Sequence, residues 1–360
     1  MTTAIQQLRD LGQSIWLDNI TRDLIRKGTL QRYIDELLVT GLTSNPTIYD
    51  QAIGAADWYD EAIHDSSTAG RSAEATFFEL AGDDLGRAAD LFRPVHRATN
   101  HVDGWVSLEV SPLLAYDTKS TLEQVKTLHH QLQRSNVFIK IPGTPEGLPA
   151  IEEAIFKGIP INVTLLFSPD QYLAAAAAYQ RGIERRLMAG MDPDVVSVAS
   201  VFISRWDKAV QSKVPPDLRN RLGIAVAQRT YRAYRELLDS QHSQSLASAG
   251  ARDQRLLWAS TGTKDPKASD VLYIEALAAP DTINTMPDVT LLAFADHGEI
   301  KGVMSEDGGN ADHVIGEFQA AGIDVDALGE QLQREGAEAF VKSWNQLLER
   351  IAAKSAVLTS

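Results

Sequence analysis

The chain has 360 residues, 44% of them hydrophobic, and a formal net charge of −14. This length and composition allow a large buried core, either in one α/β barrel with additions or in two domains. The acidic charge disfavours general binding to nucleic acid or to an anionic membrane. The chain has no cysteine, which excludes disulfides, thiolate catalysis and zinc–thiolate sites.

The first residues, MTTAIQQ, carry neither a basic segment nor an apolar segment of the kind found in secretory signals. No apolar stretch approaches the ~20 residues that a membrane-spanning helix needs. We therefore expect a cytoplasmic protein that does not enter the membrane.

Short apolar segments alternate with helical segments along most of the chain. Predicted strands are 14–18, a segment ending at 41–46, 105–110, 136–141, 158–167, 195–202, 255–260 and 281–287. Predicted helices are 3–11, 30–38, several within 56–100, 121–134, 146–156, 169–188 and 218–238. Residues 240–251 are polar and predict a surface loop, and the amphipathic tail at 310–354 predicts helices packed on the outside.

Eight strands alternating with helices predict a parallel sheet, and eight repeats favour a single (β/α)8 TIM barrel over an open sheet. We expect one domain spanning 1–360, with the barrel at about 12–290 and extra helices at both ends. No GxGxxG or GxxxxGK motif follows the first strand, which weakens a nucleotide-binding alternative.

The fourth predicted strand places Lys140 between Ile139 and Ile141, just before Pro142 and Gly143. Such an apolar run is typical of a strand buried on both faces. Desolvation lowers the pKa of a lysine amine and makes it a nucleophile, as a Schiff-base enzyme requires. The alternative is a lysine that extends from the strand end into solvent.

Polar side chains stand near the carboxyl ends of most predicted strands, where a barrel builds its active site. They are Asp18, Thr43, Asn45, Glu109, Lys140, Asn162, Thr164, Ser200 with Phe202 and Arg205, and Ser260. Singly, each has a structural explanation: Asp18 as a helix cap, Asn162 as a buried amide, Glu109 as an ion-pair partner. Two acids, a lysine and two amides in one pocket together indicate acid/base chemistry.

Five motifs give the chain a close resemblance to the transaldolase family over residues 12–290. They are GLTSNP at 41–46, SLEV at 107–110, IKIP at 139–142, NVTLLF at 162–167 and NTMP at 284–287. The resemblance implies transfer of a dihydroxyacetone unit from sedoheptulose 7-phosphate to glyceraldehyde 3-phosphate, giving erythrose 4-phosphate and fructose 6-phosphate. It implies neither a metal nor an organic cofactor, and the histidines show no metal-ligand spacing.

The resemblance also implies residue roles. Lys140 matches the Schiff-base lysine, Asp18 the acid that deprotonates the substrate hydroxyl, and Glu109 with Thr164 the pair that holds a water and moves protons. The matches to substrate-binding positions are Thr43, Asn45, Asn162, Ser200, Phe202, Arg205 and Ser260.

One position departs from the better-known branch of that family, which has a second phosphate-binding arginine where this chain has Gly262. We expect Lys264 to supply the missing charge, helped by backbone N–H groups of the Gly262 turn.

Two other functions stay open. An aldolase of the same family would release dihydroxyacetone to water, and a non-catalytic barrel would only bind sugar phosphate. The sequence does not choose between a monomer and a homodimer, and the terminal helices suit either a cover over the barrel or a dimer contact.

Overall fold

The computed structural model describes residues 3–359, and within them eight parallel strands close into a barrel in chain order. The strands are β1 (Ser14–Leu17), β2 (Val39–Thr43), β3 (Trp105–Glu109), β4 (Val137–Pro142), β5 (Ile161–Leu166), β6 (Ser197–Phe202), β7 (Arg255–Ala259) and β8 (Thr282–Met286). β1 pairs with both β2 and β8, which closes the sheet. The predicted (β/α)8 barrel is confirmed.

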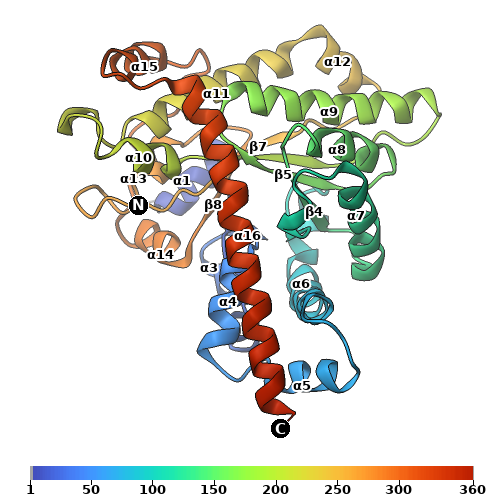
Figure 1. The fold of residues 1–360 in the computed structure, drawn as a ribbon. Coiled ribbons are helices and arrows are strands. Elements are labelled where there is room, and N and C mark those ends of the chain that lie inside the picture. The colour runs from blue at the N-terminus through green and yellow to red at the C-terminus, as the bar shows by residue number, and fades with distance from the viewer. Residues whose placement is uncertain (1–2, 360) are drawn as a thin grey trace.

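Helices surround this barrel (Figure 1). Those up to the fourth strand are α1 (Ala4–Leu11), α2 (Arg22–Arg26), α3 (Thr29–Glu36), α4 (Pro46–Ala55), α5 (Asp60–Thr68), α6 (Ala73–Ala98), the 3-10 helix η1 (Pro112–Leu114) and α7 (Thr118–Leu132). Those after it are α8 (Gly147–Phe156), α9 (Pro169–Met188), α10 (Ser204–Val210), the 3-10 helix η2 (Pro216–Leu218), α11 (Leu222–Asp239), α12 (Gln241–Ser248), α13 (Leu272–Ala276), α14 (Asp288–His297), α15 (Ala311–Ala320) and α16 (Val325–Leu358).

Local sequence accounts for several helix starts. Thr21 caps α2 by accepting a hydrogen bond from the Leu24 N–H at 3.1 Å, so Asp18 is not the cap. Ser168 and Gln171 form a reciprocal capping box at the start of α9, where Pro169 occupies the first helical position. Both features are readable from the chain because they depend only on neighbouring residues.

The prediction of a loop at 240–251 is wrong, because α12 occupies residues 241–248. The Ser240 hydroxyl accepts a hydrogen bond from the Ser243 N–H at 3.2 Å and so begins the helix. The serines that suggest a loop are mostly on its exposed face, while Ser243 is buried against α9 through Gln180. A cap and one tertiary contact thus outweigh weak helix propensity.

The tail packs on the outside of the barrel, and α16 covers the carboxyl end of the barrel. Figure 1 shows α16, in red, running from α15 at one end of the molecule to α5 at the other. α16 also packs against α4, α6, η1 and β5, and its Phe340 reaches the cavity at the carboxyl end of the barrel. Among residues 3–359, no helix combines the length and the apolar character that crossing a bilayer requires.

Aromatic side chains fill the middle of the barrel. The rings of Trp105 and Phe138 stack with centroids 4.2 Å apart, and Trp16 lies 6.2 Å from Phe138. Gly41 makes room for this layer, because a Cβ there would lie 2.6 Å from the Trp16 ring. Side chains alternate along a strand, so Lys140 faces the same way as Phe138, one layer nearer the carboxyl end.

Candidate active site

A cavity of about 690 Å³ opens at the carboxyl end of the barrel. Nine of the twelve predicted site residues line it: Asp18, Thr43, Asn45, Lys140, Ser200, Phe202, Arg205, Ser260 and Lys264. The other three, Glu109, Asn162 and Thr164, are buried and do not line it. The strand ends therefore converge as predicted, in two layers.

Lys140 is 4% exposed, so the alternative of a lysine extending into solvent is wrong. Its Nζ lies 3.3 Å from Glu109 Oε2 and donates a hydrogen bond of 3.3 Å to the Ser44 carbonyl oxygen. Glu109 and Lys140 are neighbours in the β3–β4 ladder, which places the carboxylate beside the amine. A buried ammonium is costly unless a charge and hydrogen bonds compensate it, and this arrangement supplies both.

Glu109 has spare hydrogen-bonding capacity. Neither carboxylate oxygen accepts a hydrogen bond within residues 3–359, and the buried Thr164 hydroxyl is likewise without a partner there. Burial raises the pKa of Glu109, while the nearby Lys140 ammonium acts to lower it. A carboxyl whose pKa is raised by burial takes up a proton more readily than an exposed one, and imine formation needs a group that accepts and returns protons.

Asp18 lies on the β1 side of the cavity and accepts a hydrogen bond of 2.9 Å from the Thr43 hydroxyl. Burial raises the pKa of Asp18, Lys140 and Lys264 act to lower it, and Asp288 acts to raise it. A carboxylate with a raised pKa is a better base than an exposed one.

Buried amides hold the lysine layer together. Asn162 is fully buried, donates to the Ser107 hydroxyl at 3.1 Å and accepts from the Ser200 hydroxyl at 2.7 Å. Asn45 lines the cavity, and its side-chain oxygen also caps α4 by accepting from the Ile48 N–H at 3.2 Å. The structural explanation of Asn162 as a satisfied amide is therefore correct, and it also makes that residue a rigid support next to Lys140.

Cations line the rim of the same cavity. Arg205 forms no ion pair with any residue in 3–359, and its guanidinium lies 5.7 Å from the Phe202 ring centroid. Burial lowers the pKa of Arg205, an effect that Glu335 on α16 opposes. A half-buried guanidinium without a carboxylate partner is suited to bind an anion in bidentate fashion.

The Gly262 turn brings Lys264 to this rim. The Lys264 ammonium lies 3.7 Å from the point where a Cβ of residue 262 would stand, and both residues line the cavity. Ser260, at the end of β7, adopts a left-handed backbone conformation with φ of 56°, and its hydroxyl lies 3.0 Å from that of Ser204. Strained residues of this kind persist where the surroundings hold them, often at binding sites.

Sequence reasoning missed several cavity residues, and three of them bear on the chemistry of the site. Thr285 lines the cavity and shares a 2.8 Å hydrogen bond with Thr43, and Asp288 lines it just after β8. Both stand at or just after a strand end, so the rule that identified the other residues could also have predicted them. Phe340 could not have been predicted, because in an amphipathic helix it is indistinguishable from a core residue.

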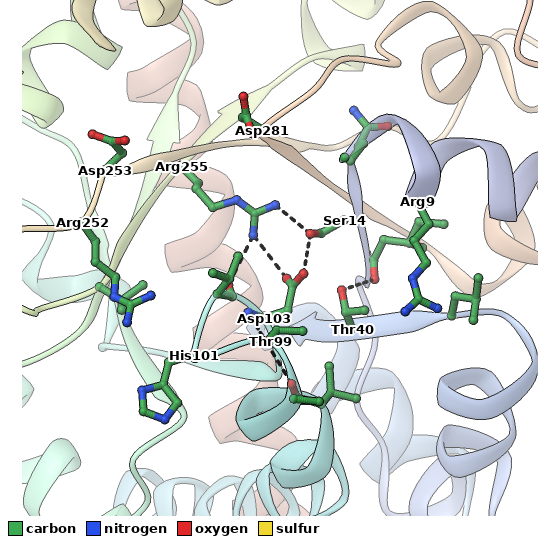
Figure 2. A pocket seen from close by; sticks show the side chains of 18 of the residues that line it. Arg9, Ser14, Thr40, Thr99, His101, Asp103, Arg252, Asp253, Arg255 and Asp281 are labelled. Carbon is green, nitrogen blue, oxygen red and sulfur yellow. Dashed lines mark hydrogen bonds and ion pairs between the residues drawn. The ribbon is translucent and has the colours of Figure 1, made fainter. Parts of the chain in front are cut away.

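A second cavity of about 690 Å³ lies at the opposite, amino end of the barrel (Figure 2). Figure 2 shows the Arg255 guanidinium between Ser14 and Asp103. It donates to Ser14 Oγ at 2.7 Å, to the Thr282 carbonyl oxygen at 3.0 Å and to Asp103 Oδ1 at 3.3 Å. These donors are occupied by the protein itself, so this network closes the bottom of the barrel.

Within residues 3–359, no three histidine or acidic side chains are grouped as a metal site would require.

The family model for transaldolase/fructose-6-phosphate aldolase matches residues 15–351. The chain belongs to this family. It is 44% identical to a transaldolase of Thermobifida fusca, with all of both chains covered. It is 42% identical to a transaldolase of Arthrobacter sp., with 97% of this chain and 96% of the relative covered, and 38% identical to a transaldolase 2 of Nostoc sp., with 98% of each covered. The predicted membership of the transaldolase family is confirmed, and with it an enzyme of the transferase class.

Proposed function

We propose that this transaldolase-family enzyme carries a dihydroxyacetone unit on Lys140 and transfers it from sedoheptulose 7-phosphate to glyceraldehyde 3-phosphate. The products are erythrose 4-phosphate and fructose 6-phosphate. One observation carries the proposal: the Lys140 amine lies at the floor of a polar cavity, 3.3 Å from the buried Glu109 carboxylate. The remaining site residues can be given roles from their positions around that amine.

Imine formation uses Lys140, Glu109 and Thr164. The amine attacks the ketone carbon of the donor, and the resulting carbinolamine loses water to give a protonated imine. Glu109 exchanges the protons that these steps require, through a water held between its carboxylate and the Thr164 hydroxyl. Within residues 3–359, Glu109 Oε1 and the Thr164 hydroxyl make no hydrogen bond, which leaves both free to hold that water.

Carbon–carbon cleavage uses Asp18. Its carboxylate takes the proton of the hydroxyl two carbons from the imine carbon, and that oxygen becomes the aldehyde of the leaving product. The electron pair of the broken carbon–carbon bond moves into the imine, leaving an enamine on Lys140. The acceptor aldehyde then reacts by the reverse sequence, with Asp18 returning the proton.

Substrate binding falls to the side chains around the cavity. Thr43, Asn45 and Ser200 face the space beside Lys140 and suit the sugar hydroxyls, and Asn162 fixes Ser200. Arg205, Ser260 and Lys264 stand at the rim, where a phosphate at the far end of an extended sugar would lie. Phe202 gives the cavity an apolar side.

A second candidate is release of free dihydroxyacetone to water, as the aldolase half of the family description implies. A barrel that binds sugar phosphate without catalysis does not fit, since the relatives are transaldolases and the ionisable residues Asp18, Glu109 and Lys140 are all present. Measuring products from fructose 6-phosphate with and without erythrose 4-phosphate separates transfer from release.

The direct test is borohydride reduction in the presence of fructose 6-phosphate, followed by peptide mass mapping. We expect the added mass on the peptide that contains Lys140, and no label in a Lys140→Met variant. Label on another lysine, or none in the active wild-type enzyme, would overturn the assignment.

A further inference from the structure

One narrow face of helix α16 packs against the carboxyl end of the barrel. Gln333, Gly336, Ala337 and Phe340 are buried and recur at helical spacing. Gly336 permits the close approach, because a Cβ there would lie 3.0 Å from Leu165 and 3.4 Å from Phe167. The backbone of α16 therefore lies directly over the carboxyl end of β5.

Gln333 attaches α16 to the two strands that carry Lys140 and Thr164. Its side-chain nitrogen donates to the Gly143 carbonyl oxygen at 3.0 Å and to the Leu165 carbonyl oxygen at 2.9 Å. Leu165 has φ of 58° at a register shift in β5, which removes its backbone from the regular ladder. Without Gln333, two buried carbonyl groups would lose a donor, at a cost of stability.

Phe340 follows Gln333 by two helical turns and reaches the cavity. Its ring centroid lies 6.0 Å from Lys140 Nζ and 6.4 Å from the ring of Phe202. Only 7% of Phe340 is exposed. An aromatic ring from β6 and one from the far end of the chain thus meet in the cavity, and the Phe340 ring is the one beside the amine.

We propose that Phe340 is a specificity-determining residue that keeps water from the three-carbon unit on Lys140, and that Gln333 is the positioning residue that holds it there. The proposal rests on the Schiff-base function above. Phe340 decides whether the unit passes to an aldehyde or is lost to water.

The two fates of the enamine differ in what the enamine carbon reacts with. In transfer, the enamine carbon attacks the acceptor aldehyde, a carbon–carbon bond forms and the aldehyde oxygen takes a proton. In loss, the enamine carbon takes a proton, water adds to the imine carbon, and the carbon–nitrogen bond breaks. The second route releases dihydroxyacetone and the free amine. The Phe340 ring offers water no hydrogen-bond partner on its side of the amine, so water can reach the imine only from the Glu109 side and the second route is disfavoured.

The test measures the ratio of free dihydroxyacetone to transferred product, with fructose 6-phosphate as donor and erythrose 4-phosphate as acceptor. We expect Phe340→Ala to raise this ratio about tenfold, a typical effect of one lost apolar contact in a pocket. Phe340→Leu keeps an apolar side chain of intermediate size and should give an intermediate ratio. Gln333→Met keeps the length but removes both donors, and should raise the ratio as well.

The matched control is Leu347→Ala, which removes a buried side chain of α16 that does not line the cavity. It should lower the unfolding midpoint and leave the ratio unchanged. An unchanged ratio in Phe340→Leu and Phe340→Ala, with Lys140 still labelled by borohydride, would make Phe340 a packing residue only. Absence of that labelling in the wild type would instead refute the Schiff-base function, whereas an unchanged ratio refutes only the role of Phe340.

Discussion

Lys140 Nζ and Glu109 Oε2 lie 3.3 Å apart, with 6% and 4% of the two side chains exposed. The pair lies above the aromatic layer of the barrel, with Lys140 at the floor of the cavity and Glu109 beside it. A buried pair of this kind is weak support for stability, because desolvation offsets much of the attraction. We therefore assign the pair a role in the reaction and not in the stability of the fold.

Lys140→Ala should abolish turnover while the protein stays folded. Loss of the covalent nucleophile should reduce kcat by at least about a thousandfold. Because burial raises the pKa of Glu109, that carboxyl can take up a proton and does not remain as an unpaired buried charge. Circular dichroism and urea unfolding would check the fold. Lys157→Ala, at an exposed lysine, is the control. Loss of secondary structure in Lys140→Ala would make the lysine structural.

The acid limb of the pH–rate profile should report Asp18. Burial raises its pKa, and Asp18 must be ionised to act as a base, so kcat/KM should fall as the pH drops through that raised pKa, above the ordinary value of about 3.9. Since Asp288 acts to raise the pKa of Asp18, Asp288→Asn should move the limb to lower pH. Asp18→Asn should remove the limb and lower kcat about a hundredfold or more. If the acid limb of the pH–rate profile stays at the same pH in both variants, the assignment of that limb to Asp18 is refuted.

Lys264 should contribute to phosphate binding. Lys264→Ala should raise the KM for fructose 6-phosphate about fivefold, a small effect because the side chain is exposed and solvent screens its charge. Inhibition by inorganic phosphate should weaken in parallel, with kcat unchanged. Lys267→Ala, also exposed but outside the cavity, is the matched control. Equal KM values for the wild type and Lys264→Ala would mean that Lys264 does not replace the phosphate-binding arginine that is missing at Gly262.

Asp207 should make stability depend on pH. Burial raises its pKa to about 6, although the Tyr273 hydroxyl and the Leu222 and Gly223 N–H groups act to lower it. The folded state then binds more protons than the unfolded state between about pH 4 and pH 6, so the Asp207 contribution to the free energy of unfolding falls by up to about 3 kcal/mol as the pH rises.

Urea midpoints of the wild type and Asp207→Asn would isolate this contribution. The stability advantage of the wild type over the variant should be largest at about pH 4 and shrink towards pH 7. A difference that stays constant with pH would mean that Asp207 has an ordinary pKa in the folded protein.

The amino end of the barrel should matter for stability and not for turnover. Asp103 pairs with Arg255 at 3.3 Å and accepts from Ser14 and Trp16 at 2.6 and 3.0 Å. Asp103→Asn leaves the Arg255 guanidinium, whose side chain is only 14% exposed, without its charge partner, which should cost about 3 kcal/mol. Adding Arg255→Gln should recover part of that loss. A change in KM for either variant would show coupling to the cavity at the other end.

The strand ends show most clearly how much of the site could be predicted from the sequence. Lys140, Asp18 and Glu109 stand out because charged residues are rare next to apolar strands, and parallel strands bring their carboxyl ends together. Thr285 and Asp288 follow the same rule at β8. The pattern does not reveal the layering, in which Glu109, Asn162 and Thr164 lie beneath the cavity. That depends on the tilt and register of neighbouring strands.

The alternation of strands and helices, the polar strand ends and the capping residues are local properties, and the order of residues alone determined them. The path of α16 was decided only in the folded molecule. Gln333, Gly336 and Phe340 fit the barrel because strands far earlier in the chain present carbonyls and apolar side chains to them. An amphipathic helix records which face is buried, but not what that face is buried against.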